Sequence, residues 1–190
     1  MLAACRTRPE AVIQEMKRHW TVLLCSLTLN AVAADSDLRD AAENALRRGV
    51  EFFRSEVAVE GTYLWRYSED LSKREGEGIA TGTQGWVQPP GTPAVGLALL
   101  AAWEATGEDY ARQAARETAY GLIRGQLRSG GWAHSIDFSP DGQERAACRV
   151  EGGKKGRNLT TLDDDSTQCS LRFLVRADQA LGYQDQTIRE

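Results

Sequence analysis

Histidine is scarce in this sequence of 190 residues, which contains only His19 and His134. A single histidine cannot by itself assemble a zinc site or a Ser-His-Asp triad, and no nucleophile motif accompanies His134. The glycine-rich stretch "GEGIATGTQG" lacks the lysine of a phosphate-binding loop and has no strand signal before it. These shortages argue against zinc hydrolases, triad hydrolases and P-loop nucleotide-binding proteins.

Long hydrophobic runs are also missing. The apolar stretch from Trp20 to Leu29 is too short to cross a bilayer as a helix. Lys17 and Arg18 precede it and the small residues Ala31-Val32-Ala33 follow it, which is the pattern of a secretory signal peptide. The sequence therefore predicts an exported protein, secreted or periplasmic, with no membrane insertion after the signal is cleaved.

The signal peptide divides the chain into two parts. Nothing in residues 1–15 fits an export signal, so Met16 is the predicted start, and residues 1–34 are an upstream extension plus the signal peptide. Removing them takes four Lys/Arg and two Asp/Glu from totals of 23 and 27, which leaves 19 basic and 25 acidic residues and a net charge of −6. Such a mildly acidic exported chain is a poor candidate for nucleic-acid binding.

Cysteine is sparse in the predicted mature chain, where Cys148 and Cys169 remain after Cys5 and Cys25 are discarded. Two alternatives stay open for this pair. An exported protein can join the two as a disulfide, but Cys169 lies in a helical pattern and also suits a small buried residue.

Apolar residues at helical spacing are the strongest structural signal in the sequence. This spacing predicts helices over residues 37–59, from Pro93 to Gly107, over residues 108–128 and after the aspartates at 163–165. Between the first two, residues 61–93 read as a long ordered loop, because Trp65, Tyr67 and Trp86 are unusual in disordered segments. An offset of 75 residues brings Gly107 onto Gly182 and matches one helix hairpin to another. The predicted fold is all-α, an incomplete α/α toroid of helix hairpins with long inserted loops.

The stretch "TTLDDDSTQCSLRFL" places three consecutive aspartates at the start of a helix. One alternative is helix capping, in which Asp163 or Asp164 accepts N–H groups of the first turn. The other is a cation site, because adjacent carboxylates repel each other and hard ions such as calcium take clustered carboxylate oxygens.

Two motifs carry a resemblance to known proteins. The segment "QLRSGGW" resembles the turn that ends an inner helix in α/α-toroid proteins, which include terpenoid cyclases and polysaccharide lyases. The segment "TTLDDDSTQCSLRFL" resembles the acidic helix start of the pectate lyases of polysaccharide lyase family ten. The resemblance implies that residues 35–190 are the N-terminal part of a pectate-lyase-like domain. It also implies calcium-assisted β-elimination of polygalacturonate, in which a cation neutralises the uronate carboxylate.

The resemblance assigns roles to particular residues. It makes Asp163 and Asp164 metal ligands and places Thr167 at the position of the family's threonine, as a substrate-binding residue. Asp165 stands where the family pattern has a small residue. The family's arginine base falls beyond Glu190, so the catalytic residue stays unknown, and activity requires the missing C-terminal half.

Other candidate residues come from the chemistry of a polyuronate ligand. The basic segment "ERAACRVEGGKKGR" offers Arg157 and Lys155 as carboxylate-binding residues, with a solvated loop as the alternative. The aromatic residues Trp132, Trp65 and Tyr67 can stack on sugar rings, with packing beneath the turn as the alternative for Trp132.

Three functions follow, with calcium as the expected cofactor and polygalacturonate or a related acidic polysaccharide as the expected partner. The first is a pectate-lyase-like protein, incomplete and inactive if the second half is absent. The second is a non-catalytic carbohydrate-binding or helical interaction module. The third, a terpenoid-cyclase-like toroid, depends on the "QLRSGGW" motif alone. The oligomeric state is left open.

Overall fold

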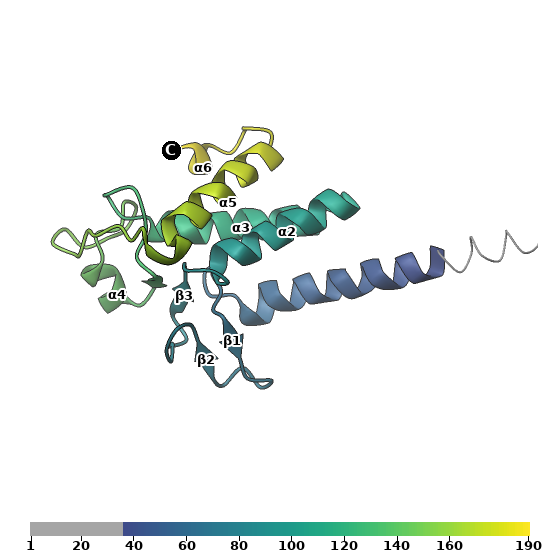
Figure 1. The fold of residues 1–190 in the computed structure, drawn as a ribbon, viewed down its shortest axis with the longest axis horizontal. Coiled ribbons are helices and arrows are strands. Elements are labelled where there is room, and N and C mark those ends of the chain that lie inside the picture. The colour runs from purple at the N-terminus through teal and green to yellow at the C-terminus, as the bar shows by residue number, and fades with distance from the viewer. Residues whose placement is uncertain (1–35) are drawn as a thin grey trace, which may run out of the picture. The chain divides into compact units, whose positions relative to one another are not determined.

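The computed structural model describes residues 36–190 (Figure 1). The described chain divides between Ala45 and Leu46, and the sheets, the core and the pocket all lie in the second unit, Leu46–Glu190. A helix covers residues 36–52 and passes into a π-helical turn, η1 (Phe53–Val57). The predicted signal peptide lies outside the described residues. Within residues 36–190, no helix is both long enough and apolar enough to span a membrane.

The central helices are α2 (Thr92–Thr106) and α3 (Asp109–Gly125), joined by a tight turn. Pro93 lies at the first turn of α2, where its missing N–H costs nothing. Gly107 ends α2 with φ +71°, a left-handed conformation that glycine adopts without strain, and its N–H donates to the carbonyl of Trp103 at 2.7 Å. The hairpin matches the predicted segments, but α3 ends at Gly125, earlier than the predicted 128, because Gln126 turns extended.

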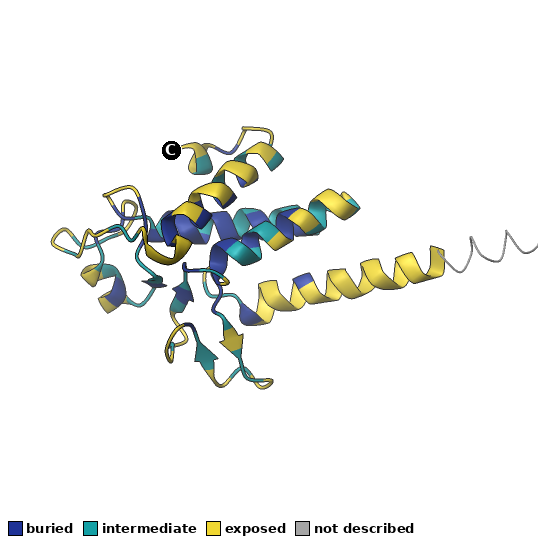
Figure 2. Ribbon diagram, in the orientation of Figure 1, coloured by how far each residue is buried: buried dark blue, intermediate teal, exposed yellow. Residues whose placement is uncertain are grey.

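The third long helix, α5 (Ser166–Ala180), crosses this hairpin and is followed by Gly182 with φ +66° and the short α6 (Gln186–Arg189). Its Phe173 is fully buried against Gly96 of α2, where an added Cβ would lie 2.3 Å from the ring. The two helices therefore approach closely at a glycine. Figure 2 shows the inner faces of these helices as the buried centre of the unit. The largest fully buried side chains are Trp132, Phe173, Leu100, Leu122, Val57 and Val87.

The prediction of an all-α toroid is wrong. Residues 36–190 are about 53% helical, and two small antiparallel sheets accompany the helices, so the fold is mixed. One sheet pairs β1 (Arg66–Tyr67) with β2 (Arg74–Glu75), and the other pairs β3 (Gln84–Trp86) with β4 (Ser135–Asp137). Three of these strands lie in the segment that was predicted as a loop. Strands of two or three residues are too short to show a clear alternation in the sequence.

Candidate functional site

The β3–β4 ribbon has one buried face and one outer face. Residues at the middle of each strand, Gly85 and Ile136, are buried, whereas the residues on either side are half-buried. Because side chains alternate along a strand, Gln84 and Trp86 share the outer face with Ser135 and Asp137 of the partner strand. The register pairs Gln84 with Asp137 and Trp86 with Ser135. The ribbon thus packs on the core through Gly85 and Ile136 and leaves its opposite face partly exposed.

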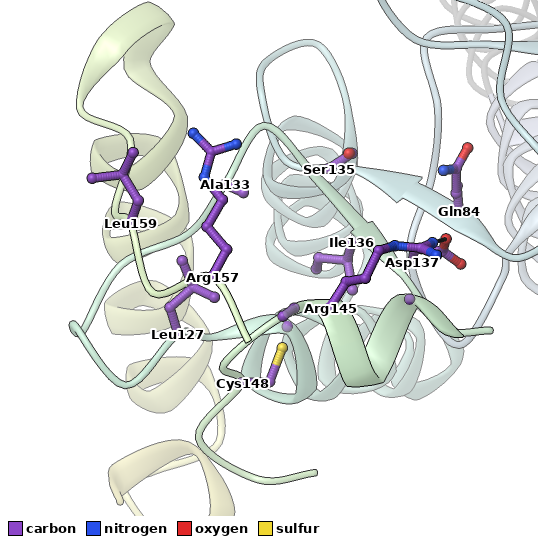
Figure 3. Close-up of a pocket in the computed structure, with 13 residues that line it drawn as sticks. Gln84, Leu127, Ala133, Ser135, Ile136, Asp137, Arg145, Cys148, Arg157 and Leu159 are labelled. Carbon is purple, nitrogen blue, oxygen red and sulfur yellow. Dashed lines mark hydrogen bonds and ion pairs between the residues drawn. The ribbon is translucent and has the colours of Figure 1, made fainter. Parts of the chain in front are cut away.

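A pocket of about 250 Å³ opens at this ribbon (Figure 3). The outer-face residues Gln84, Ser135 and Asp137 line one side, and the segment after β4 supplies two arginines, Arg145 and Arg157. The floor and remaining walls are mostly small or apolar: Gly125, Leu127, Ala133, Ile136, Gly142, Ala146, Cys148 and Leu159. The pocket therefore combines an apolar lining with a few polar groups, as small-molecule sites do.

Arg145 is already paired inside this pocket. Its Nη2 lies 3.2 Å from Oδ2 of Asp137, and Asp137 also accepts hydrogen bonds from the Ser139 N–H and the Thr83 hydroxyl, both at 3.0 Å. Burial by itself would raise the pKa of Asp137, but these hydrogen bonds and the Arg145 charge outweigh it and hold that pKa below its usual value. Asp137 is therefore ionised at neutral pH and neutralises Arg145.

Arg157 has a backbone held by hydrogen bonds and, unlike Arg145, a side chain without a partner. Its N–H donates to the carbonyl of Arg145 at 2.7 Å, and its own carbonyl accepts from Ala147 N–H at 3.0 Å. Within residues 36–190, the guanidinium has no hydrogen bond and no ion pair. Figure 3 shows it pointing away from Asp137. A cation thus stands at the pocket without a protein counter-ion.

Two neutral groups in the pocket also have spare donors. The side-chain oxygen of Gln84 accepts from Thr81 N–H at 2.9 Å, which directs its amide NH2 elsewhere. In the described part of the chain, that NH2 and the Ser135 hydroxyl have no hydrogen-bond partner. The pocket can therefore offer a guanidinium, an amide and a hydroxyl to one ligand.

The three consecutive aspartates do not act together. They form a 3-10 turn, η2 (Asp163–Asp165), in which Asp164 and Asp165 have φ +50° and +60°. Asp163 Oδ1 accepts from Asp164 N–H at 3.0 Å, Asp164 Oδ2 accepts from Gln88 Nε2 at 2.9 Å, and Asp165 pairs with Arg172. None of the three side chains caps α5. The left-handed backbone at two successive positions turns the carboxylates toward different partners.

The directions of these three carboxylates also decide whether the turn can bind calcium. Calcium takes six to eight oxygen ligands, so a protein site for it gathers several carboxylates around one point. Over residues 36–190, no group of three or more acidic, histidine or cysteine side chains is arranged to hold a metal ion. The residues as placed do not fit a calcium cage, and the calcium assignment of Asp163 and Asp164 stays a prediction.

Of the other predicted residues, Trp132 and Thr167 lie together in the interior, whereas Lys155 lies at the surface. Trp132 is fully buried and its indole N–H donates to the carbonyl of Leu122 at 2.8 Å, so its ring packs the core. Thr167 is also buried, donating to the carbonyl of Thr161 at 2.6 Å and accepting from Trp132 N–H at 3.3 Å. Lys155 is exposed and lines a separate hollow with Lys154. Of the four predicted binding residues, Arg157 alone lines the pocket.

The two described cysteines are both free thiols. Cys148 lines the pocket and Cys169 lies in α5, each buried, and burial raises the pKa of both. Cys148 and Cys169 are therefore not joined by a disulfide in this structure.

Sequence reasoning missed the residues that the ribbon supplies. Gln84, Ser135 and Asp137 come together through strand pairing across more than fifty residues. The alternation in "HSIDF" was the available signal, since Ile136 and Phe138 separate polar residues there. It is too short to distinguish from a loop without its partner strand.

Comparisons with known proteins leave the family open. No protein-family model matches this chain, and it matches neither a curated protein nor a solved structure. The resemblance to pectate lyases therefore stays a prediction from two sequence motifs.

Proposed function

We propose that this protein binds an acidic polysaccharide, polygalacturonate, by holding a uronate carboxylate on Arg157. The observation that carries the proposal is the unpaired guanidinium of Arg157 at the mouth of a partly apolar pocket. A planar guanidinium matches a carboxylate with two parallel hydrogen bonds, which a lysine ammonium cannot reproduce. The proposal agrees with the ligand that the sequence resemblance implies.

The neighbouring groups suit the rest of a sugar acid. The free amide NH2 of Gln84 and the Ser135 hydroxyl can bond ring hydroxyls, and the apolar lining at Leu127 and Leu159 suits the C–H faces of a pyranose. Arg145 contributes little direct attraction because Asp137 already neutralises it. The pocket is also at the small end for ligand sites, which begin at roughly 300 Å³, so it has room for one uronate unit.

Binding is the part of the resemblance that the pocket supports. β-Elimination requires a base at the C5 proton in addition to neutralisation of the carboxylate. No residue between 36 and 190 has been placed in that role, so lyase activity stays a prediction, as does export to the periplasm or the outside. The non-catalytic carbohydrate-binding module is thus the form of the proposal that the described residues support.

Calorimetric titration tests the proposal with two polymers that differ only in charge. Polygalacturonate should bind, and its fully methyl-esterified form should bind at least tenfold more weakly, because a neutral ester cannot pair with the guanidinium (about 1.5–3 kcal/mol for a charged hydrogen bond). Equal binding of both polymers, or binding of neither, would refute the proposal. Incubating the same samples and measuring absorbance of unsaturated uronates separates a lyase from a binding module.

A further inference from the structure

Two tryptophans, Trp65 and Trp86, lie beside the pocket and contact each other; we call this pair the aromatic corner. Trp65 and Trp86 have ring centroids 6.0 Å apart and planes inclined at 69°, so one ring stands edge-on to the other. Both residues are half-buried. Sugar stacking requires a ring that solvent can reach. Trp65 and Trp86 are partly accessible, whereas Trp132 is fully buried.

Gln88 fixes both rings. Trp65 Nε1 donates to the Gln88 carbonyl at 2.9 Å, and Trp86 Nε1 donates to the Gln88 side-chain oxygen at 3.3 Å. Gln88 is 8% exposed, and its amide is directed by Asp164, which accepts from Nε2 at 2.9 Å. Satisfied N–H groups and a buried partner hold the rings in one orientation before any ligand arrives, which lowers the entropy cost of binding.

The two rings have different surroundings. The backbone of Gly76 packs flat against Trp86, where an added Cβ would lie 2.2 Å from the indole Cδ2 atom. Trp86 is therefore covered on that side and supports its neighbour. Trp65 is the other half-buried ring of the pair.

The corner is continuous with the pocket. Trp86 shares the outer face of the ribbon with Gln84 and is paired with Ser135, both of which line the pocket. Opposed side chains on one face of a sheet lie about 5 Å apart. From Gln84 to Trp86 the strand covers two residue steps, or about 7 Å at 3.3 Å per residue, and the Trp65 ring centroid lies 6.0 Å from that of Trp86. Trp65 is therefore the neighbour of a strand face that reaches the pocket.

We propose that Trp65 is a sugar-stacking residue of a second subsite, next to the Arg157 pocket, and that the protein consequently recognises a chain of uronates in preference to one. The inference rests on the proposed function and deepens it. Arg157 anchors one carboxylate, and the C–H face of a neighbouring sugar in the same chain lies on the Trp65 indole. Gln88 and Trp86 are positioning residues, since they hold the Trp65 ring.

Titration with galacturonic acid and its trimer tests the inference. The wild-type protein should bind the trimer about tenfold more tightly than the monomer, from the added aromatic contact. Trp65→Ala should remove most of that difference and leave monomer affinity unchanged, and Trp65→Phe should retain part of it. Trp103→Phe is the matched control, since this half-buried α2 tryptophan lies near Arg112 and outside the ribbon. It should leave both affinities unchanged.

The outcomes separate this inference from the proposed function. Equal wild-type affinity for monomer and trimer would overturn the second subsite while leaving the Arg157 pocket intact. Tighter trimer binding that survives in a folded Trp65→Ala protein, as judged by its thermal melting curve, would also overturn it. Failure of the wild-type protein to bind either ligand would overturn both.

Discussion

The basic segment around the pocket and the acidic turn at 163–165 make an instructive pair. Both are clusters of like charge in the sequence, and both were candidate binding sites. In the acidic turn, Asp164 accepts a hydrogen bond from Gln88 and Asp165 forms an ion pair with Arg172. Asp163 accepts a hydrogen bond from the backbone. In the basic segment, Arg145 is taken by Asp137, but Arg157 keeps an unpaired guanidinium beside a cavity.

The difference shows that a cluster of like charges in the sequence is a weaker guide to a binding site than a charged side chain that has no partner in the structure. Three carboxylates that face three different partners do not gather around one cation. A guanidinium held by its backbone and left without a counter-ion retains its full capacity for a ligand carboxylate.

The largest expected effect comes from removing the free cation. Arg157→Gln should weaken oligogalacturonate binding about 10- to 100-fold, because a charge-assisted hydrogen bond is worth roughly 1.5–3 kcal/mol. Calorimetric titration measures the change. Lys155→Gln is the matched control, since Lys155 is an equally charged residue of the same segment but lines a different hollow. Similar losses in the two variants would mean that the segment acts only as a diffuse basic surface.

Stability should respond to the partner of Arg145. Asp137→Asn should lower the free energy of unfolding by about 1–2 kcal/mol at pH 7, because it weakens hydrogen bonds to a partly buried carboxylate. The folded pKa of Asp137 is lowered, so its stabilisation is complete above the unfolded value of about 3.9 and is lost as pH falls through the folded pKa. Urea unfolding at several pH values should show the two proteins converging below pH 4. A constant difference down to pH 2 would contradict this assignment.

The same substitution should make Arg145 resemble Arg157. With Asp137→Asn, the Arg145 guanidinium loses its counter-ion, and affinity for oligogalacturonate should increase about two- to fivefold, since exposed ion pairs are worth roughly 0.2–1 kcal/mol. Titration of the variant measures the change. A large loss of affinity in a folded variant would instead make Asp137 itself a ligand-binding residue.

The smallest effect is expected at the acidic turn. Because its carboxylates diverge, Asp163→Ala and addition of a calcium chelator should each change affinity for oligogalacturonate by less than about twofold. The pectate-lyase resemblance predicts the opposite, a loss of affinity in both experiments. Such a loss would place a cation at the turn and would reverse the ranking of the two regions.

Local signals were enough to predict the long helices, whereas the short α4 (Pro140–Arg145) was missed. Pro93 and Gly107 delimit α2 because each has a backbone preference that acts without tertiary contacts. The strands were missed because β3 and β4 have three residues each and are stabilised by pairing across the chain. The close approach of Gly96 and Phe173 is likewise a tertiary contact with no local signature.

The site was predictable only in part. Arg157 could be selected from its basic surroundings, but its freedom depends on Arg145 having a partner, Asp137, in a strand that was not predicted. Trp132 has the residue type of a sugar-binding platform, yet its position after a helical turn buries it. Trp65 could be selected from the sequence as a sugar-stacking aromatic, but its relation to the pocket depends on the strand register that pairs its neighbour Trp86 with Ser135.

The most direct test of the Arg157 pocket is a titration with galacturonic acid followed through the arginine side-chain Nε–Hε signals in NMR spectra. The Arg157 signal, assigned from the Arg157→Gln spectrum, should shift with saturation, because a bound carboxylate replaces water at its guanidinium. The Arg145 signal should move less, since Asp137 already occupies that group. Saturable binding that leaves the Arg157 signal unmoved would contradict the central claim that this arginine holds the uronate.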